Sequence, residues 1–134
     1  MPKIFTSKTQ KTGELGENIA ERFLVKHGFL IVERNYTKKC GEIDIIALKD
    51  NVLHFIEVKS ISKDLNDSFF ETNTWRAEDN MHPWKMKRLS RTIQIYLSSK
   101  VDSFEKEWKI DLLIVYLDSK NKKAKIKVVN DIII

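Results

Sequence analysis

Cysteine, proline and glycine are scarce in this chain of 134 residues, which contains one cysteine, two prolines and four glycines. The single cysteine, Cys40, excludes an intrachain disulfide framework and fits a reducing compartment. No apolar run approaches the roughly 20 residues that cross a bilayer. The first fourteen residues lack the apolar block of a signal peptide. We therefore expect a cytoplasmic protein with no membrane partner.

The composition is that of a globular protein, with 42% hydrophobic and 32% charged residues. The length suffices for one domain with its own core, and no repeat, low-complexity tract or linker divides it. We therefore predict a single domain over residues 1–134. A net charge of +5 is compatible with a nucleic acid partner but does not establish one.

Positive charge is concentrated in two segments of the chain. Residues 83–100 contain five lysines and arginines and no acid, and residues 118–127 are rich in lysine, whereas residues 60–80 are net acidic. Solvated faces explain most charge runs of this kind. A nucleic-acid-binding role becomes the better explanation only where a catalytic site lies nearby.

Hydrophobic periodicity predicts two helices and five strands. In chain order they are a helix over 13–28, strands over 29–36, 42–48 and 52–59, a helix from Pro83 to about Ser99, and strands over 108–117 and 124–134. Thr12 is a candidate N-cap and Gly28 a candidate helix stop. The expected apolar helix faces are Leu15, Ile19, Ala20, Phe23 and Leu24 in the first helix, and Met86, Leu89, Ile93 and Leu97 in the second. The segment 60–82 is predicted to be irregular. This order predicts an α/β sandwich on a mixed sheet, with the strand 108–117 buried on both faces and the last strand at an edge.

The stretch "GEIDIIALKDNVLHFIEVKS", residues 41–60, places charged side chains inside two hydrophobic strands. Charged residues are rarely buried unless they are paired or bind a metal. Because side chains alternate along a strand, Glu57 and Lys59 share one face. Asp44 joins that face only in one register of the hairpin.

The turn between the two strands decides this register. If Asp50 and Asn51 form a two-residue turn, Asp44 lies opposite Glu57, and Glu42 lies opposite Lys59. A three-residue turn would instead place the two acids on opposite faces.

In the two-residue register, the carboxylates of Asp44 and Glu57 would repel each other unless a cation lay between them. Mg²⁺ takes oxygen ligands of this kind, and the Val58 carbonyl could add a third. Lys59 could then orient water or neutralise charge on phosphorus, as metal-assisted phosphodiester hydrolysis requires. The alternative is a structural network in which Lys59 pairs with Glu42 and Glu57, and an isolated E-x-K pattern on a strand favours that alternative.

Three segments together resemble a known family: "GELGENIAERFLVKHGFLIVERNY", "GEIDIIA" and "HFIEVKS", with weaker similarity at "KMKRL", "KIDLLIV" and "VVND". They resemble the YraN family of small predicted endonucleases. That family is similar to the PD-(D/E)xK, or restriction-endonuclease-like, superfamily and to archaeal Holliday-junction resolvases. The resemblance implies a three-layer α/β/α fold with a mixed central sheet.

The resemblance also implies roles for particular residues. Asp44 corresponds to the first acid of the superfamily, and Glu57 and Lys59 correspond to its (D/E)xK pair. Glu17 corresponds to the additional acid of the resolvase-like branch, where it would orient water at the metal. A first-turn acid that complements the helix dipole is the alternative role for Glu17. Lys85 corresponds to a basic helix position suited to phosphate.

Arg88, three residues after Lys85, would lie on the same face of that helix and would share the contact with nucleic acid. Its alternative role is that of a solvated surface residue. The chain departs from the family pattern at Ile61 and Lys109, where arginines are expected, and in the long acidic segment 60–82.

These observations predict a Mg²⁺- or Mn²⁺-dependent endonuclease that hydrolyses phosphodiester bonds in DNA, with selectivity for junctions or other branched structures. Junction resolution needs two active sites, so it would require a homodimer. A nucleic-acid-binding module without catalytic turnover is the competing prediction. A scaffold that contacts neither metal nor DNA is a third.

Overall fold

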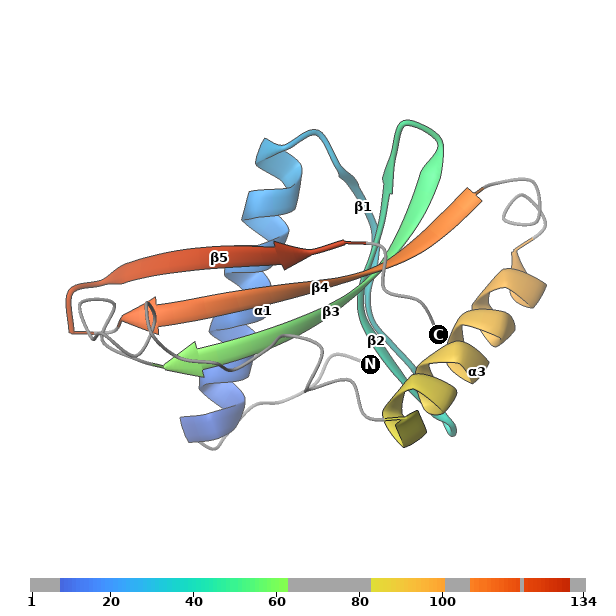
Figure 1. The fold of residues 1–134 in the computed structure, drawn as a ribbon, viewed down its shortest axis with the longest axis horizontal. Helices are drawn as coiled ribbons and strands as arrows, with labels where there is room; N and C mark the ends of the chain where they lie inside the picture. Colours follow the sequence, from blue (N-terminus) through green and yellow to red (C-terminus); the bar gives the residue numbers. More distant parts are fainter. Residues whose placement is uncertain (1–7, 63–82, 101–106, 119, 131–134) are drawn as a thin grey trace.

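A five-stranded sheet lies between two helices in the computed structural model, which describes residues 8–62, 83–100, 107–118 and 120–130 (Figure 1). The elements are α1 Lys8–Lys26, β1 Leu30–Lys38, β2 Gly41–Lys49, β3 Val52–Ser62, α3 Pro83–Ser99, β4 Glu107–Asp118 and β5 Lys123–Val129. The strand order is β1-β2-β3-β4-β5, with β3 and β4 parallel and the other pairs antiparallel. With α1 on one face and α3 on the other, this confirms the predicted three-layer α/β/α fold with a mixed sheet, consistent with a restriction-endonuclease-like architecture.

The helix α1 ends as the sequence predicts but begins earlier. Gly28 adopts a φ of 90°, and the amides of Gly28 and Phe29 donate to the carbonyls of Val25 and Leu24, which is the Schellman arrangement. The helix starts at Lys8, so the prediction of Thr12 as its N-cap is wrong. No proline or glycine interrupts residues 8–12, and a threonine inside a helix costs less than about 0.7 kcal/mol relative to alanine.

Each helix buries the apolar face that its periodicity predicts, with one exception. Leu89, Ile93 and Leu97 of α3 are buried, and Met86 packs against the same cluster. On α1 the predicted face packs on the sheet, except that Leu15 is 47% exposed. The strand β4 is buried along most of its length, as predicted for a strand covered on both faces.

The hairpin of β2 and β3 closes with a two-residue turn. Asp50 and Asn51 have φ values of 51° and 63°, which are typical of a type I′ turn, and Lys49 pairs with Val52. Pairing continues in this register as far as Ile45 and Ile56 and then ends. The structure therefore adopts the two-residue turn, one of the two alternatives that the sequence left open. The two strands separate before the expected direct pairs Asp44–Glu57 and Glu42–Lys59 can form.

The separation coincides with a break in the alternation of β2. Ile43 lies in the core cluster on the α3 side, whereas Ile45 lies in the cluster on the α1 side. In an unbroken strand, residues two apart share a face. In β1, Asn35 lies between the residues paired with Ile43 and Ile45, and it has a φ of 53°. Both strands thus bend at one place, and Figure 1 shows β1 and β2 curving from β3 toward α3.

The strands β3 and β5 end at residues other than those predicted. β3 continues to Ser62, so residues 60–62 are strand and not loop, and the rest of the segment predicted to be irregular lies outside the described residues. The last strand, β5, forms the sheet edge as predicted but ends at Val129. None of the helices in the described ranges has the length and apolar character needed to cross a membrane.

Candidate functional site

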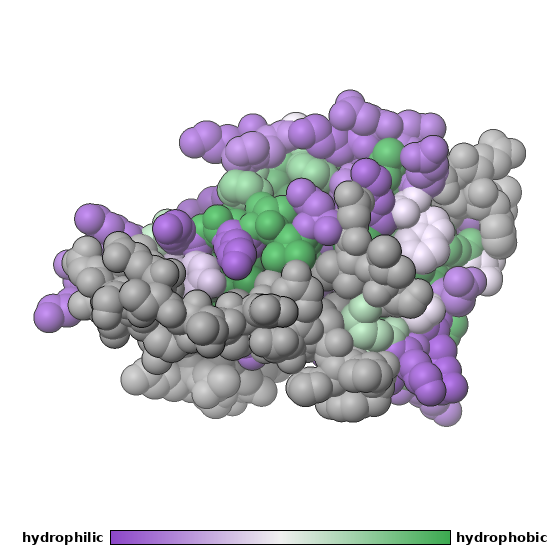
Figure 2. Space-filling view, viewed as in Figure 1, coloured by the Kyte–Doolittle hydropathy of each residue, from purple (hydrophilic) through white to green (hydrophobic). Residues whose placement is uncertain are grey.

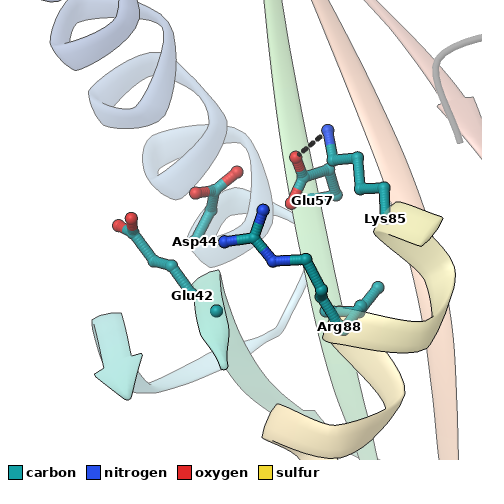
Figure 3. Close-up of a pocket in the computed structure, with 7 residues that line it drawn as sticks. Glu42, Asp44, Glu57, Lys85 and Arg88 are labelled. Carbon is teal, nitrogen blue, oxygen red and sulfur yellow. Dashed lines mark ion pairs between the residues drawn. The ribbon is translucent and has the colours of Figure 1, made fainter. Parts of the chain in front are cut away.

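A pocket of about 270 Å³ opens where β2 and β3 separate, beneath the first turns of α3 (Figure 3). Its lining residues are Gly41, Glu42, Asp44, Glu57, Lys85, Arg88 and Leu89. The acids come from the two strands and the cations come from α3, and Figure 3 shows both groups pointing into the same space. We call this site the acidic pocket.

The carboxylate of Asp44 connects the two strands beyond the end of their ladder. Its Oδ2 accepts a hydrogen bond of 2.8 Å from the backbone amide of Val58. Burial raises the pKa of Asp44, repulsion from Glu57, Glu17 and Glu42 raises it further, and the Val58 hydrogen bond acts in the opposite direction. An ionised Asp44 is therefore in a position that a nearby cation would stabilise.

Glu57 projects into the acidic pocket from β3 and meets a lysine of α3. Its Oε1 lies 2.7 Å from Lys85 Nζ, and the glutamate side chain is 15% exposed. Burial of this degree strengthens a charged pair relative to one at the open surface. The structure therefore places one lysine directly beside the acids, and that lysine is Lys85.

Glu17 approaches the same acids from the other helix. A Cβ at Gly16 would overlap Ser60, so the glycine lets α1 pass close to β3 and brings Glu17 toward Asp44. Arg34 Nη2 lies 3.5 Å from Glu17 Oε1. Glu17 raises the pKa of Asp44 by repulsion, although it does not line the pocket.

Asn35 joins two of the acids, and sequence reasoning assigned it no role. With its amide nitrogen turned toward the carboxylates, Asn35 donates to Glu17 Oε1 at 3.1 Å and to Glu42 Oε1 at 2.9 Å. Glu42 was likewise considered only as a structural partner of Lys59. An asparagine inside a β-strand could have been the signal, because asparagine tolerates the left-handed conformation that Asn35 adopts.

Lys59 lies beside the acidic pocket and not in it. It is exposed and is absent from the lining residues, although its position two residues after Glu57 places it on the same face of β3. The predicted contact of Lys59 with Glu42 does not form as a cross-strand pair. Lys59 is therefore available to a ligand that lies across the pocket and the adjoining sheet.

Arg88 and the start of β2 fix α3 over the pocket. Arg88 Nε donates to the Cys40 carbonyl at 3.1 Å, and Cys40 Sγ lies 3.3 Å from Thr92 Oγ1. A Cβ at Gly41 would lie 3.0 Å from Thr92 Oγ1, so a side chain there would force the Thr92 side chain to shift by a few tenths of an ångström. The predicted cleft-side position of both Lys85 and Arg88 agrees with their place in the pocket lining.

The residues that face the pocket fit a hydrated divalent cation better than a closed metal site. Among the described residues, no group of three histidine, cysteine, aspartate or glutamate side chains could hold an ion. Mg²⁺ is often bound by one or two carboxylates together with water and phosphate oxygens. Asp44 and Glu57 meet that requirement. The Val58 carbonyl faces the same gap as its amide, because both groups of a strand residue point to one side.

The raised pKa of Asp44 leads to a prediction about stability. Its raised pKa means that the native chain holds this proton more tightly than the unfolded chain, whose aspartate pKa is about 3.9. Stability contributed by the protonated form is therefore lost as the pH rises from about 4 through the native pKa. We expect Asp44→Asn, which keeps an acceptor for Val58, to raise the melting temperature at pH 7 without divalent cations.

Thermal unfolding of both proteins between pH 4 and pH 8 checks this prediction. The difference in melting temperature should shrink toward pH 4 and also on addition of Mg²⁺, which would bind the wild-type carboxylates. A less stable Asp44→Asn protein at pH 7 would show that the charge of Asp44 is already compensated.

The three-layer fold and the acidic pocket at the parting of two central strands define an α/β protein of restriction-endonuclease-like architecture. The chain belongs to the uncharacterised protein family UPF0102, whose family model matches residues 16–115. This confirms the family-level resemblance to YraN-type proteins.

Relatives from two bacterial genera support this membership. A UPF0102 protein of Campylobacter fetus subsp. fetus is 45% identical over 103 residues, which cover 77% of this chain and 81% of the relative. A UPF0102 protein of Campylobacter hominis is 39% identical over 106 residues, with coverages of 79% and 84%. A UPF0102 protein of Sulfurovum sp. is 38% identical over 116 residues, with coverages of 86% and 86%.

Proposed function

We propose that this protein is a Mg²⁺- or Mn²⁺-dependent endonuclease of the PD-(D/E)xK superfamily that hydrolyses phosphodiester bonds in DNA. One observation carries the proposal: Asp44 and Glu57, from two strands that no longer pair, face one pocket together with Lys85 and Arg88. Acids that could bind a cation and basic groups that could bind phosphate thus share one opening. Such an arrangement suits electrostatic stabilisation of a reacting phosphate.

Asp44, Glu57 and the Val58 carbonyl are the groups that would hold the cation. When bound there, Mg²⁺ would supply Lewis-acid polarisation of the phosphoryl oxygens. The Val58 amide keeps Asp44 oriented, and Glu17, held by Arg34, adds negative charge on the α1 side. Cation binding would offset both the burial and the repulsion that raise the pKa of Asp44.

The basic residues would act on the substrate. Lys85 would exchange its carboxylate partner for a phosphate oxygen, and Arg88, at the rim of the pocket, would contact the backbone beside it. Lys59, exposed on the same face, would orient the attacking water or neutralise charge on phosphorus. These contacts position a backbone and select no base sequence.

Branched DNA is the substrate that the resemblance to archaeal Holliday-junction resolvases favours. Resolving a junction requires two incisions, so this activity would need a homodimer with two acidic pockets. A nuclease acting on simpler structures, such as flaps, needs only one.

A nucleic-acid-binding module without turnover is the second candidate. The observation in its favour is the Lys85–Glu57 ion pair, which gives Glu57 a partner without any metal. In that case the acids would be structural, and the basic residues alone would bind DNA.

Labelled duplex, single-stranded, flap and four-way-junction DNA, each with Mg²⁺ or Mn²⁺, separate the two candidates. The endonuclease proposal expects cation-dependent cleavage of at least one substrate and none with EDTA. If the protein binds these DNAs but cleaves none of them at high protein concentration, the endonuclease proposal is rejected and the binding module is supported.

Lys85 and Arg88 provide a separate prediction about binding. Each alanine variant should lower the slope of log affinity against log salt by about one, with little change in sequence preference, because each contact releases counterions. Lys87 is the matched control, since it is exposed and lies about 200° around the helix from Lys85. If both Lys85→Ala and Arg88→Ala show the wild-type slope in salt titrations, these residues do not contact phosphate and only form part of a solvated helix face.

A further inference from the structure

The edge strand β5 carries a row of lysines that the acidic pocket does not use. Lys123, Lys125 and Lys127 alternate along it and are exposed, and residues 119–130 contain no acid. Within the part of the chain that the structure describes, none of these three ammonium groups forms an ion pair. Figure 2 shows hydrophilic residues at the left end of the molecule, where Figure 1 places the start of β5.

These lysines point to the side of the sheet that carries the acidic pocket. Val129 is two residues after Lys127 in the alternating row, and it packs against the core cluster beneath α3. Ile126, one residue out of step with the row, packs against the cluster beneath α1. Side chains of one parity share one face of a strand. The row therefore lies on the α3 side.

The register of the sheet connects the lysine row to the pocket. Glu57 pairs with Leu112 of β4, which pairs with Val129, so these three residues form one line across the sheet. The next line is Lys59, Ile114 and Lys127. With neighbouring strands about 4.8 Å apart, Lys127 lies roughly 10 Å from Lys59 at the backbone.

Beyond the buried Ile114, cations continue along the edge strand. Lys125 and Lys123 follow Lys127 at steps of about 7 Å along β5, because alternate residues of an antiparallel strand are separated by two rises of about 3.4 Å. The row spans about 14 Å. Duplex DNA carries one charge per about 1.7 Å of its axis, so phosphates are available to every lysine of such a row.

We propose that Lys123, Lys125 and Lys127 form a second phosphate-binding surface, which holds the backbone of a DNA duplex arm while the same DNA enters the acidic pocket. The inference rests on the proposed function and deepens it, because it gives the substrate an extended arm that crosses β3, β4 and β5. It also explains why this basic segment lies on the pocket side of the sheet. A DNA that is too short to reach β5 gains nothing from these lysines.

The experiment compares two triple variants with equal loss of charge. One carries Lys123→Gln, Lys125→Gln and Lys127→Gln. The control carries Lys26→Gln, Lys87→Gln and Lys100→Gln, which alter exposed lysines on α1, on the outer side of α3 and just beyond α3. Affinity for a labelled duplex of about 20 base pairs is measured without divalent cations over a salt series, and again for a duplex of about six base pairs.

We expect the β5 variant to lose two to three units of the salt slope on the long duplex, at about 0.9 per phosphate contact, and to match wild type on the short one. The control should keep the wild-type slope on both. If the β5 triple variant does not fold, as judged by circular dichroism, single Lys125→Gln and Lys127→Gln variants should each lose about one unit.

Two results would overturn the proposal. One is a wild-type slope in the β5 variant on the long duplex. The other is self-association of that variant with unchanged DNA binding, which would show that the lysines only protect the sheet edge from pairing. Because the measurement needs no cleavage, loss of the slope in a protein that cuts no substrate supports the surface while rejecting the nuclease. Normal cleavage by a β5 variant whose salt slope is unchanged would support the nuclease and reject the lysine surface.

Discussion

Asp44→Asn should abolish cation-dependent cleavage of DNA while leaving the protein folded. The amide oxygen of asparagine can still accept the hydrogen bond from the Val58 amide, so the link between β2 and β3 survives. The substitution removes the charge that would hold the cation. Glu57→Gln should have the same effect on cleavage, because it removes the second of the two carboxylates that would hold the cation.

Binding of DNA without metal separates catalysis from affinity in these variants. Neither substitution should weaken binding, and both should strengthen it, because a negative charge near phosphate is lost. Glu57→Gln should have the larger effect, since it also releases Lys85 from its ion pair. Isothermal calorimetry should show weaker Mg²⁺ binding in both variants.

The matched control is Asp50→Asn, which makes the same chemical change at the turn of the same hairpin. Asp50 is exposed there with a φ of 51°, a conformation that asparagine adopts readily. Its cleavage rate should equal that of wild type. A well-folded Glu57→Gln or Asp44→Asn protein that cleaves at the wild-type rate would rule out the proposed mechanism.

Lys59→Ala should lower the cleavage rate by roughly 10²–10⁴ while Mg²⁺ still binds, because it leaves both carboxylates and removes the group that would act on water. Lys59 is exposed, so the substitution removes no core contact and the fold should persist. DNA binding should fall slightly with the loss of one cation. Single-turnover cleavage at saturating protein measures the rate apart from affinity.

Lys85 provides the comparison that tests this assignment. It lies 2.7 Å from Glu57, whereas Lys59 lies outside the pocket lining, so geometry alone would favour Lys85 as the lysine that acts at the reacting phosphate. If Lys59 serves the water, Lys85→Ala should mainly weaken binding and change the single-turnover rate little. A rate that collapses in Lys85→Ala and persists in Lys59→Ala would transfer the role to Lys85.

Much of the fold could be predicted because its signals are local. Helix and strand periodicity located all seven described elements, and Gly28 marked the end of α1. The sequence allowed either a two-residue or a three-residue turn at Asp50 and Asn51, and only the former puts Asp44 and Glu57 on one face, as the structure has them. These features depend on the conformational preferences of a few neighbouring residues, which the sequence displays directly.

The residues that form and support the acidic pocket were harder to predict from the sequence. Asn35 and Arg34 hold Glu17 from β1, and Glu42 is held through Asn35, yet no spacing in the sequence connects these positions. The pairing of Lys85 with Glu57 joins residues that are far apart in the chain. Contacts of this kind depend on how α1 and α3 pack on the sheet.

The sequence by itself determined the elements, the position of the hairpin turn and the presence of charged residues in two hydrophobic strands. Only the tertiary structure decided where the β2–β3 ladder ends and which cation meets which acid. The reason is that hydrogen bonding alone would let the strands continue pairing past Ile45 and Ile56. In the folded chain, the β1–β2 end instead packs on α3, where Arg88 donates to the Cys40 carbonyl and Gly41 lies against Thr92.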